Sequence, residues 1–118
     1  MKVWINGDFY DRDQAKASVF DAGFQHGVGL FETMQARGKH VFRLDDHLRR
    51  LHDSARELGL TERLQEQPLA EAVQRTVEEN AFPKTRIRLT LTGGDLNLLT
   101  KDGVSQVDPT IVIVAQPS

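Results

Sequence analysis

Cysteine is absent from the 118 residues, so the chain can form neither disulfides nor thiolate metal sites. No apolar run approaches the length of about 18 residues that is needed to cross a bilayer. The first residues read as strand and turn and lack the charged region and apolar stretch of a secretory signal. These absences predict a cytoplasmic protein without membrane insertion.

Neither sign of charge dominates the chain. There are 15 lysines and arginines against 17 aspartates and glutamates, for a net charge of −2. Such a balance offers no broad positive surface to nucleic acid, so nucleic acid is not an expected partner. The four histidines, at positions 26, 40, 47 and 52, lack the spacing of a metal site, and none is expected. Any anion site must therefore be local.

Glycine and proline are few, and they mark turns. Asn6-Gly7 separates two short apolar segments, 3–5 and 9–10, and predicts a β-hairpin because both turn residues tolerate positive φ. A short strand is expected at 18–20. Three glycines then fall within 23–29 and predict an irregular, tightly turned segment.

Two segments have the periodicity of helices. The first, which ends before Gly59, carries apolar residues at helical spacing: Leu44, Leu48, Leu51, Ala55 and Leu58. The second is expected to start near Pro68, whose φ suits a first turn, and to continue through Val77 to about Asn80.

The remaining segments have the pattern of strands. Residues 30–37 and 40–42 predict a second hairpin, and 85–92 alternates strictly between apolar and polar residues. A long loop is expected over 93–108, followed by a fully buried strand at 110–114. These elements predict one α+β domain over 1–118, in two layers, with a mostly antiparallel sheet and two main helices on one face.

The first predicted helix carries a polar stripe beside its apolar stripe, at Arg43, His47, Arg50 and Ser54. Arginine suits a phosphate because its planar fork donates paired, charge-assisted hydrogen bonds. The alternative is that these residues are solvated and pair with aspartates of the same helix, at positions 45, 46 and 53.

Four other residues could take part in binding or catalysis, but each also has an ordinary structural explanation. His26 could serve in acid–base or hydrogen-bonding roles, or stabilise the glycine-rich turn. Glu32, in mid-strand, is either on the surface or paired, for instance with an arginine of a neighbouring strand. Arg86 and Arg88 share a strand face and could attract a carboxylate, or simply face solvent.

Read together, three linked motifs resemble the first domain of class IV, or fold-type IV, pyridoxal-phosphate enzymes. They are Phe20-Asp21 with Gly23-Phe24, then Gly27-x-Gly29-Leu30-Phe31-Glu32-Thr33, then the run from Phe42-Arg43-Leu44 through His47, Arg50 and Leu51 to Ser54-Ala55. The match continues through the strands at 86–88 and 110–114 and so spans the whole chain. The family includes branched-chain and D-amino-acid aminotransferases and aminodeoxychorismate lyases.

The resemblance implies roles for four residues. Arg50 would bind the phosphate of pyridoxal phosphate, whereas His26, Phe31 and Arg88 would line the substrate pocket, with Arg88 helping to accept a carboxylate. The cofactor would act as an electron sink for the α-carbon of an amino acid or an aminodeoxychorismate-like substrate. Residues 33–34, Thr-Met, favour the lyases and D-amino-acid enzymes over branched-chain ones. His26 and Val28 replace the tyrosine and aspartate of many relatives.

The lysine that holds the cofactor belongs to the family's second domain, and no lysine of this chain matches it. The chain is therefore expected to be the N-terminal small domain, without catalytic residues of its own and inactive alone. Its expected partners are the missing C-terminal domain and further copies in a homo-oligomer. The alternative is a non-catalytic dimerisation or ligand-binding module that retains the scaffold.

Overall fold

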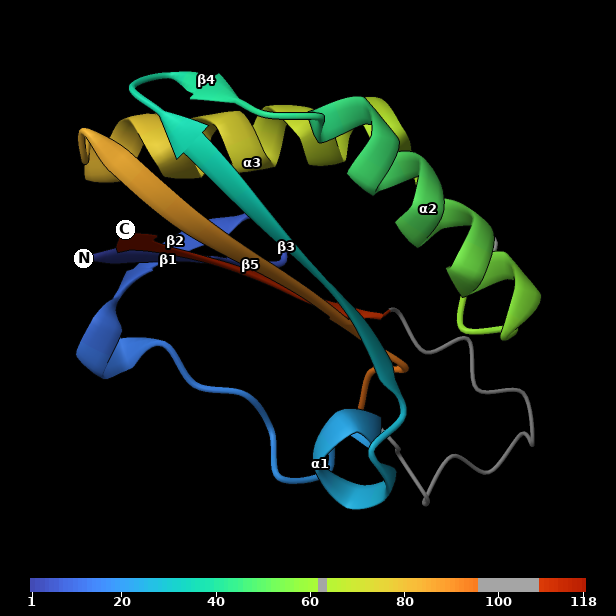
Figure 1. Ribbon diagram of the computed structural model, residues 1–118. Coiled ribbons are helices and arrows are strands. Elements are labelled where there is room, and N and C mark those ends of the chain that lie inside the picture. The colour runs from blue at the N-terminus through green and yellow to red at the C-terminus, as the bar shows by residue number, and fades with distance from the viewer. Residues whose placement is uncertain (62–63, 96–108) are drawn as a thin grey trace.

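The computed structural model describes residues 1–61, 64–95 and 109–118. They form one six-stranded sheet in the order β2-β1-β6-β5-β3-β4, in which every neighbouring pair is antiparallel. Helices α2 and α3 cover one face of the sheet, and the short helix α1 lies beyond the other face (Figure 1). This confirms the predicted α+β architecture with two main helices on one face.

The first strands confirm the predicted hairpin. Strand β1 (Lys2–Ile5) turns into β2 (Asp8–Asp11) at Asn6 and Gly7, whose φ values are +46° and +104°. The Asn6 side chain also accepts a hydrogen bond from the Ile111 backbone at 2.7 Å, which ties the turn to β6. The hairpin is thus fixed to the sheet at its turn.

Helix α2 (Leu44–Glu57) confirms the first predicted helix. Leu48, Leu51 and Ala55 are buried against the sheet, and Gly59 follows the helix with a φ of +67°. Helix α3 (Glu66–Asn80) begins two residues before Pro68, which therefore lies inside the first turn. A proline is tolerated there because the first backbone N–H groups of a helix have no partner within it.

The strands beneath the helices follow the predicted alternation. In β5 (Lys84–Thr92), Ile87, Leu89 and Leu91 are fully buried under the helices, whereas Arg86 and Arg88 project from the opposite, open face. Strand β3 (Gly29–Arg37) pairs with β5 along its whole length and with the two-residue β4 (His40–Val41) on its other side.

The core lies between the sheet and the two helices. Its fully buried residues include Met34, Leu48, Leu51, Val73 and Ile113. Among the described residues, the short helix α1 is the α-helix on the side of the open face (Figure 1). Within the described residues, no helix is long and apolar enough to cross a membrane.

Two expectations were wrong. Residues 18–20 form no strand; after a short 3-10 helix (Arg12–Gln14) the chain runs irregularly to α1 (Ala22–His26), whose N-terminus is capped by the Asp21 side chain.

Strand β6 (Thr110–Pro117) is longer than predicted, and only Ile113 and Ala115 are buried. Its alternate residues lie on the open face, so the strand is half-buried. The predicted loop at 93–108 falls mostly outside the described residues.

Candidate functional site

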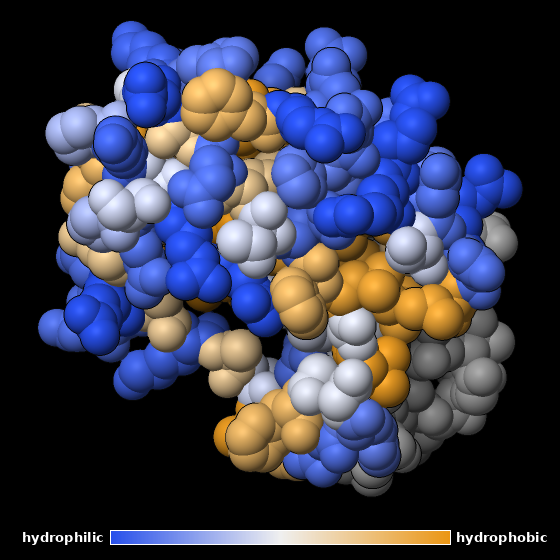
Figure 2. Space-filling model, viewed as in Figure 1, coloured by the Kyte–Doolittle hydropathy of each residue, from blue (hydrophilic) through white to orange (hydrophobic). Residues whose placement is uncertain are grey.

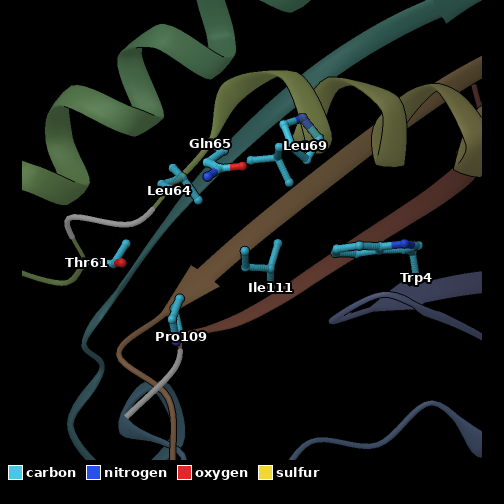
Figure 3. Close-up of a pocket in the computed structure, with 8 residues that line it drawn as sticks. Trp4, Thr61, Leu64, Gln65, Leu69, Pro109 and Ile111 are labelled. Atoms are coloured by element: carbon cyan, nitrogen blue, oxygen red, sulfur yellow. The ribbon is translucent and has the colours of Figure 1, made fainter. Parts of the chain in front are cut away.

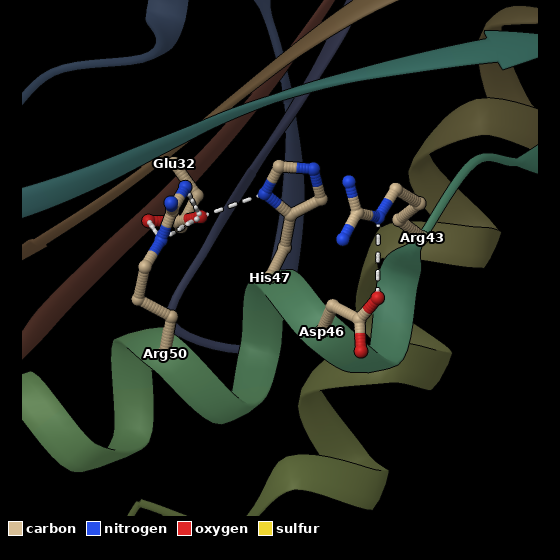
Figure 4. Close-up of polar contacts among 5 residues, drawn as sticks. All are labelled: Glu32, Arg43, Asp46, His47 and Arg50. Atoms are coloured by element: carbon tan, nitrogen blue, oxygen red, sulfur yellow. Dashed lines mark hydrogen bonds and ion pairs between the residues drawn. The ribbon is translucent and has the colours of Figure 1, made fainter.

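The carboxylate of Glu32 lies between strand β3 and helix α2. Arg50 donates to it from Nε, at 3.0 Å to Oε2, and from Nη2, at 2.7 Å to Oε1, while His47 Nδ1 lies 2.7 Å from Oε1 (Figure 4). His47 and Arg50 are three residues apart on the helix and so face the same strand. The sequence pattern placed these two side chains correctly on one stripe.

The two sides of this cluster differ in exposure. The Glu32 side chain is 7% exposed, whereas that of Arg50 is 66% exposed. Glu32 engages Nε and Nη2 of the guanidinium, and Nη1 has no partner among the described residues. Arg50 is therefore held at one edge and keeps donors for a further anion.

Electrostatics fix the charge states of the pair. Burial alone would raise the pKa of Glu32, but the hydrogen bonds and positive charges of Arg50 and His47 outweigh it, and the pKa lies below the ordinary value. The same contact raises the pKa of Arg50. Both groups are thus ionised near neutral pH.

Phe31 and Arg88 meet on the opposite face of the sheet. The guanidinium carbon of Arg88 lies 3.7 Å from the centroid of the Phe31 ring, a cation–π contact. Phe31 remains 57% exposed. Because guanidinium donors lie in the plane of the group, stacking on a ring leaves the N–H edges of Arg88 available to a carboxylate.

A pocket of about 620 Å³ opens beside Phe31 on this face. One wall comes from the α1 region, with Gly23, Phe24 and Gly27, and the floor from the sheet, with Thr90 and Val112 among others. Outside this pocket, Figure 2 shows a further apolar patch between α1 and the C-terminal half of α2. The surface that lines the pocket itself is mostly apolar. The pocket is therefore a largely apolar cavity next to a stacked arginine.

Helix α1 is attached to the ends of two strands. Asp21 is buried, and its carboxylate accepts hydrogen bonds from the Gly23 backbone at 2.7 Å and from Thr92 Oγ1 at 2.9 Å. Burial opposes ionisation of Asp21, but hydrogen bonds from Thr110, Thr92 and Gly23 outweigh it and lower its pKa. This carboxylate is ionised, and each of its oxygens accepts a hydrogen bond.

The predicted site residues do not all converge. Phe31 and Arg88 are in contact, but Arg50 lies across the sheet from them, because Phe31 and Glu32 are consecutive in β3 and project to opposite faces. His26 is exposed at the end of α1. Phe31 and Arg88 therefore lie on one face of the sheet at the beginning of β3, and Glu32 and Arg50 lie on the other.

Sequence reasoning also missed two contacts. Glu32 pairs with helix α2 and not with a neighbouring strand, and Asp21 received no role apart from its place in a family motif. A periodic pattern identifies faces of one element but does not show which elements meet. The alternative reading of the polar stripe holds only for Arg43, which pairs with Asp46 (Figure 4).

A second apolar pocket, of about 350 Å³, lies on the helix side of the sheet near the start of α3. Figure 3 shows Trp4, Leu69 and Ile111 around it. Among the described residues that line this pocket, none is a predicted site residue and none is charged. These lining residues therefore offer no charge to recognise a phosphate or a carboxylate.

The comparisons with known proteins agree with this architecture. Residues 29–118 match the family described as amino-transferase class IV, and the chain therefore belongs to that family. A Methanocaldococcus jannaschii protein named "Putative branched-chain-amino-acid aminotransferase" is 39% identical over 99% of the chain and 40% of its own length. A Staphylococcus epidermidis D-alanine aminotransferase is 34% identical over 79% of the chain and 33% of its own length.

A solved structure shows the same fold. The branched-chain aminotransferase of Thermoproteus uzoniensis with norvaline is 33% identical, has a TM-score of 0.83 and covers 99% of this chain and 40% of its own. The chain thus spans about 40% of the length of such relatives. Both branched-chain and D-alanine aminotransferases are among the relatives, so the preference for lyases and D-amino-acid enzymes over branched-chain ones stays a prediction. Class IV aminotransferases are pyridoxal-phosphate enzymes that act on amino acids.

Proposed function

We propose that this chain is the cofactor-phosphate and substrate-lining domain of a class IV aminotransferase or aminodeoxychorismate lyase-like enzyme, with Arg50 as the phosphate ligand. The single observation that supports this most is the state of Arg50. Its guanidinium is fixed at one edge by a buried carboxylate and yet is largely exposed. A side chain restrained in this way loses little conformational freedom when an anion binds.

The donor set fits a phosphate ester. Arg50 keeps Nη1 and the outer side of Nη2 for its oxygens, in the charge-assisted geometry that phosphate favours. Glu32 is saturated by Arg50 and His47, so its negative charge is balanced inside the protein. When bound, the cofactor would supply an electron sink for bond cleavage at the α-carbon of an amino acid.

On the open face, we assign substrate contacts to His26, Phe31 and Arg88. Arg88 would accept a carboxylate through its in-plane N–H groups, and Phe31 would hold that guanidinium flat while lining the apolar pocket. His26, exposed at the end of α1, would approach the substrate from the same end of β3. The catalytic lysine, the remaining cofactor contacts and the homo-oligomer belong to the longer protein, which we place in the cytoplasm.

The test uses the full-length polypeptide. Arg50→Ala should weaken pyridoxal-phosphate retention about tenfold or more, because one charge-assisted anion contact is lost. Arg50→Lys should fall between Ala and wild type, because a point charge replaces the fork. Arg43→Ala is the matched control on the same helix, since its partner is the exposed Asp46. Cofactor affinity is read by equilibrium dialysis, and an unchanged value for Arg50→Ala would refute the assignment.

The non-catalytic module makes a different prediction. A reading frame without a downstream lysine-bearing domain, and without a companion gene that encodes one, would support it. Sequencing the flanking DNA distinguishes the two at little effort.

A further inference from the structure

The Asp21 carboxylate joins three parts of the fold that are far apart in sequence. It caps α1 through the Gly23 backbone and accepts a hydrogen bond from Thr92 at the end of β5, and Thr110 at the start of β6 also helps to lower its pKa. Asp21 is only 4% exposed. A buried carboxylate that is hydrogen-bonded through both oxygens is unusual on a connecting segment, since such segments normally run over the surface.

Backbone hydrogen bonds also restrain the conformation of residues 22–28, which follow Asp21. The Ala22 N–H donates to the Gly94 carbonyl at 2.8 Å, and the Val28 N–H donates to the Ala22 carbonyl at 3.3 Å. A Cβ added to Gly23 would lie 2.7 Å from Thr92 Cγ2, a distance that side chains do not adopt. Thr92 thus contacts this segment through its hydroxyl and also through its methyl group.

Helix α1 has five residues and cannot be stable by itself. It nevertheless supplies one wall of the open-face pocket, through Gly23 and Phe24, and Gly27 and Gly29 connect it to Phe31. Phe24 is 74% exposed and contributes little burial to hold the helix in place. The placement of this wall therefore depends on polar contacts to the sheet.

We propose that Asp21 is a positioning residue, which fixes α1 and the beginning of β3 against the ends of β5 and β6 and thereby sets the shape of the substrate pocket. Its functional consequence rests on the proposed function, because the pocket is assigned to substrate there. Asp21 also lines the pocket, but both of its carboxylate oxygens are engaged by Gly23 and Thr92, so we assign it no contact with a reacting group. It acts through the Gly23 backbone and Thr92.

The experiment compares near-isosteric variants around the Asp21 carboxylate. Thr92→Val keeps the shape of the side chain but removes the hydroxyl, which donates to Asp21 and accepts from the Gly94 N–H at 3.2 Å. Thr92→Ser keeps the hydroxyl for both bonds and should behave as wild type. Asp21→Asn removes the charge with little change in size. Thr90→Val is the matched control, because Thr90 lines the same pocket without bonding to Asp21.

The first readout is amide hydrogen exchange of the 118-residue chain. Thr92→Val and Asp21→Asn should accelerate exchange at residues 22–28 about tenfold or more, while the central amides of β5 stay within about twofold of wild type. Thr92→Ser and Thr90→Val should match wild type. Equal acceleration over the whole sheet would overturn the proposal, because Asp21 would then stabilise the fold as a whole. No acceleration at residues 22–28 would also overturn it, because Asp21 would then not hold α1.

The second readout is the steady-state kinetics of the full-length protein. Thr92→Val should raise the KM for the amino acid about threefold or more and leave kcat within about twofold, and Thr92→Ser should reverse the change. An unchanged KM despite local acceleration of exchange would also overturn the proposal. If the wild-type protein shows neither transamination nor lyase activity, the proposed function fails, while hydrogen exchange still decides whether Asp21 holds α1.

Discussion

Glu32 and Arg50 connect strand β3 to helix α2 through both carboxylate oxygens, at 2.7 and 3.0 Å. The strand residue is buried and the helix residue is mostly exposed, so the pair lies at the boundary of the core. A contact of this kind fixes how the helix rotates over the sheet. It also determines in which direction the free edge of the guanidinium points.

Glu32→Gln should destabilise the chain by about 1.5–3 kcal/mol, the range for hydrogen bonds that involve a charged group. The new amide presents a donor where a carboxylate oxygen had accepted from Arg50 or His47. Asp46→Asn is the control, because it also removes a carboxylate bonded to an arginine Nε, but at an exposed pair. The control should stay within about 0.5 kcal/mol of wild type. Urea unfolding measures both, and equal losses would contradict a special role for Glu32.

Stability should depend on pH through Glu32. Its pKa in the folded chain lies below the ordinary value of 4.5, so its contribution is complete well above pH 4.5 and is lost as the pH falls through the folded-state value. The stability difference between wild type and Glu32→Gln should therefore shrink as the pH is lowered from 7 to 3. Urea unfolding at several pH values tests this. A difference that persists unchanged at pH 3 would show that the carboxylate charge does not contribute.

The chain alone should not form a site-specific covalent adduct with pyridoxal phosphate. Its five lysines, at positions 2, 16, 39, 84 and 101, do not match the place of the catalytic lysine in the family. Borohydride reduction followed by peptide mass analysis should therefore find only low, scattered labelling. A single lysine labelled stoichiometrically would contradict the division of roles between this chain and the rest of the protein.

Local patterns predicted the elements that are stabilised by their own periodicity. Helix α2 and strand β5 were predicted from apolar spacing, and the structure buries the expected residues Leu48, Leu51, Leu89 and Leu91. The Asn6 turn was predicted from its tolerance of positive φ. In each case the information lies within a few neighbouring residues.

The errors arose where distant residues decide the structure. The β-branched residues of 110–114 suggested burial on both sides, but helices cover only one face of β6. The apolar residues of 18–20 suggested a strand, but no strand pairs with them, and the capping Asp21 starts a helix directly afterwards. The contact of Glu32 with α2 joins residues 18 positions apart on different elements, which no local pattern reveals.

The strand order has a consequence for how the chain acquires its structure. Strand β1 borders only β2 and β6, and the contact between Asn6 and Ile111 joins positions 105 residues apart. During synthesis the opening hairpin therefore has no further strand to pair with until residues 110–117 have left the ribosome, although it can contact α3 earlier, through the hydrogen bonds between Lys2 and Asn80. Because closing such a long loop is slow, the apolar side of Trp4 should remain accessible to chaperones for most of translation.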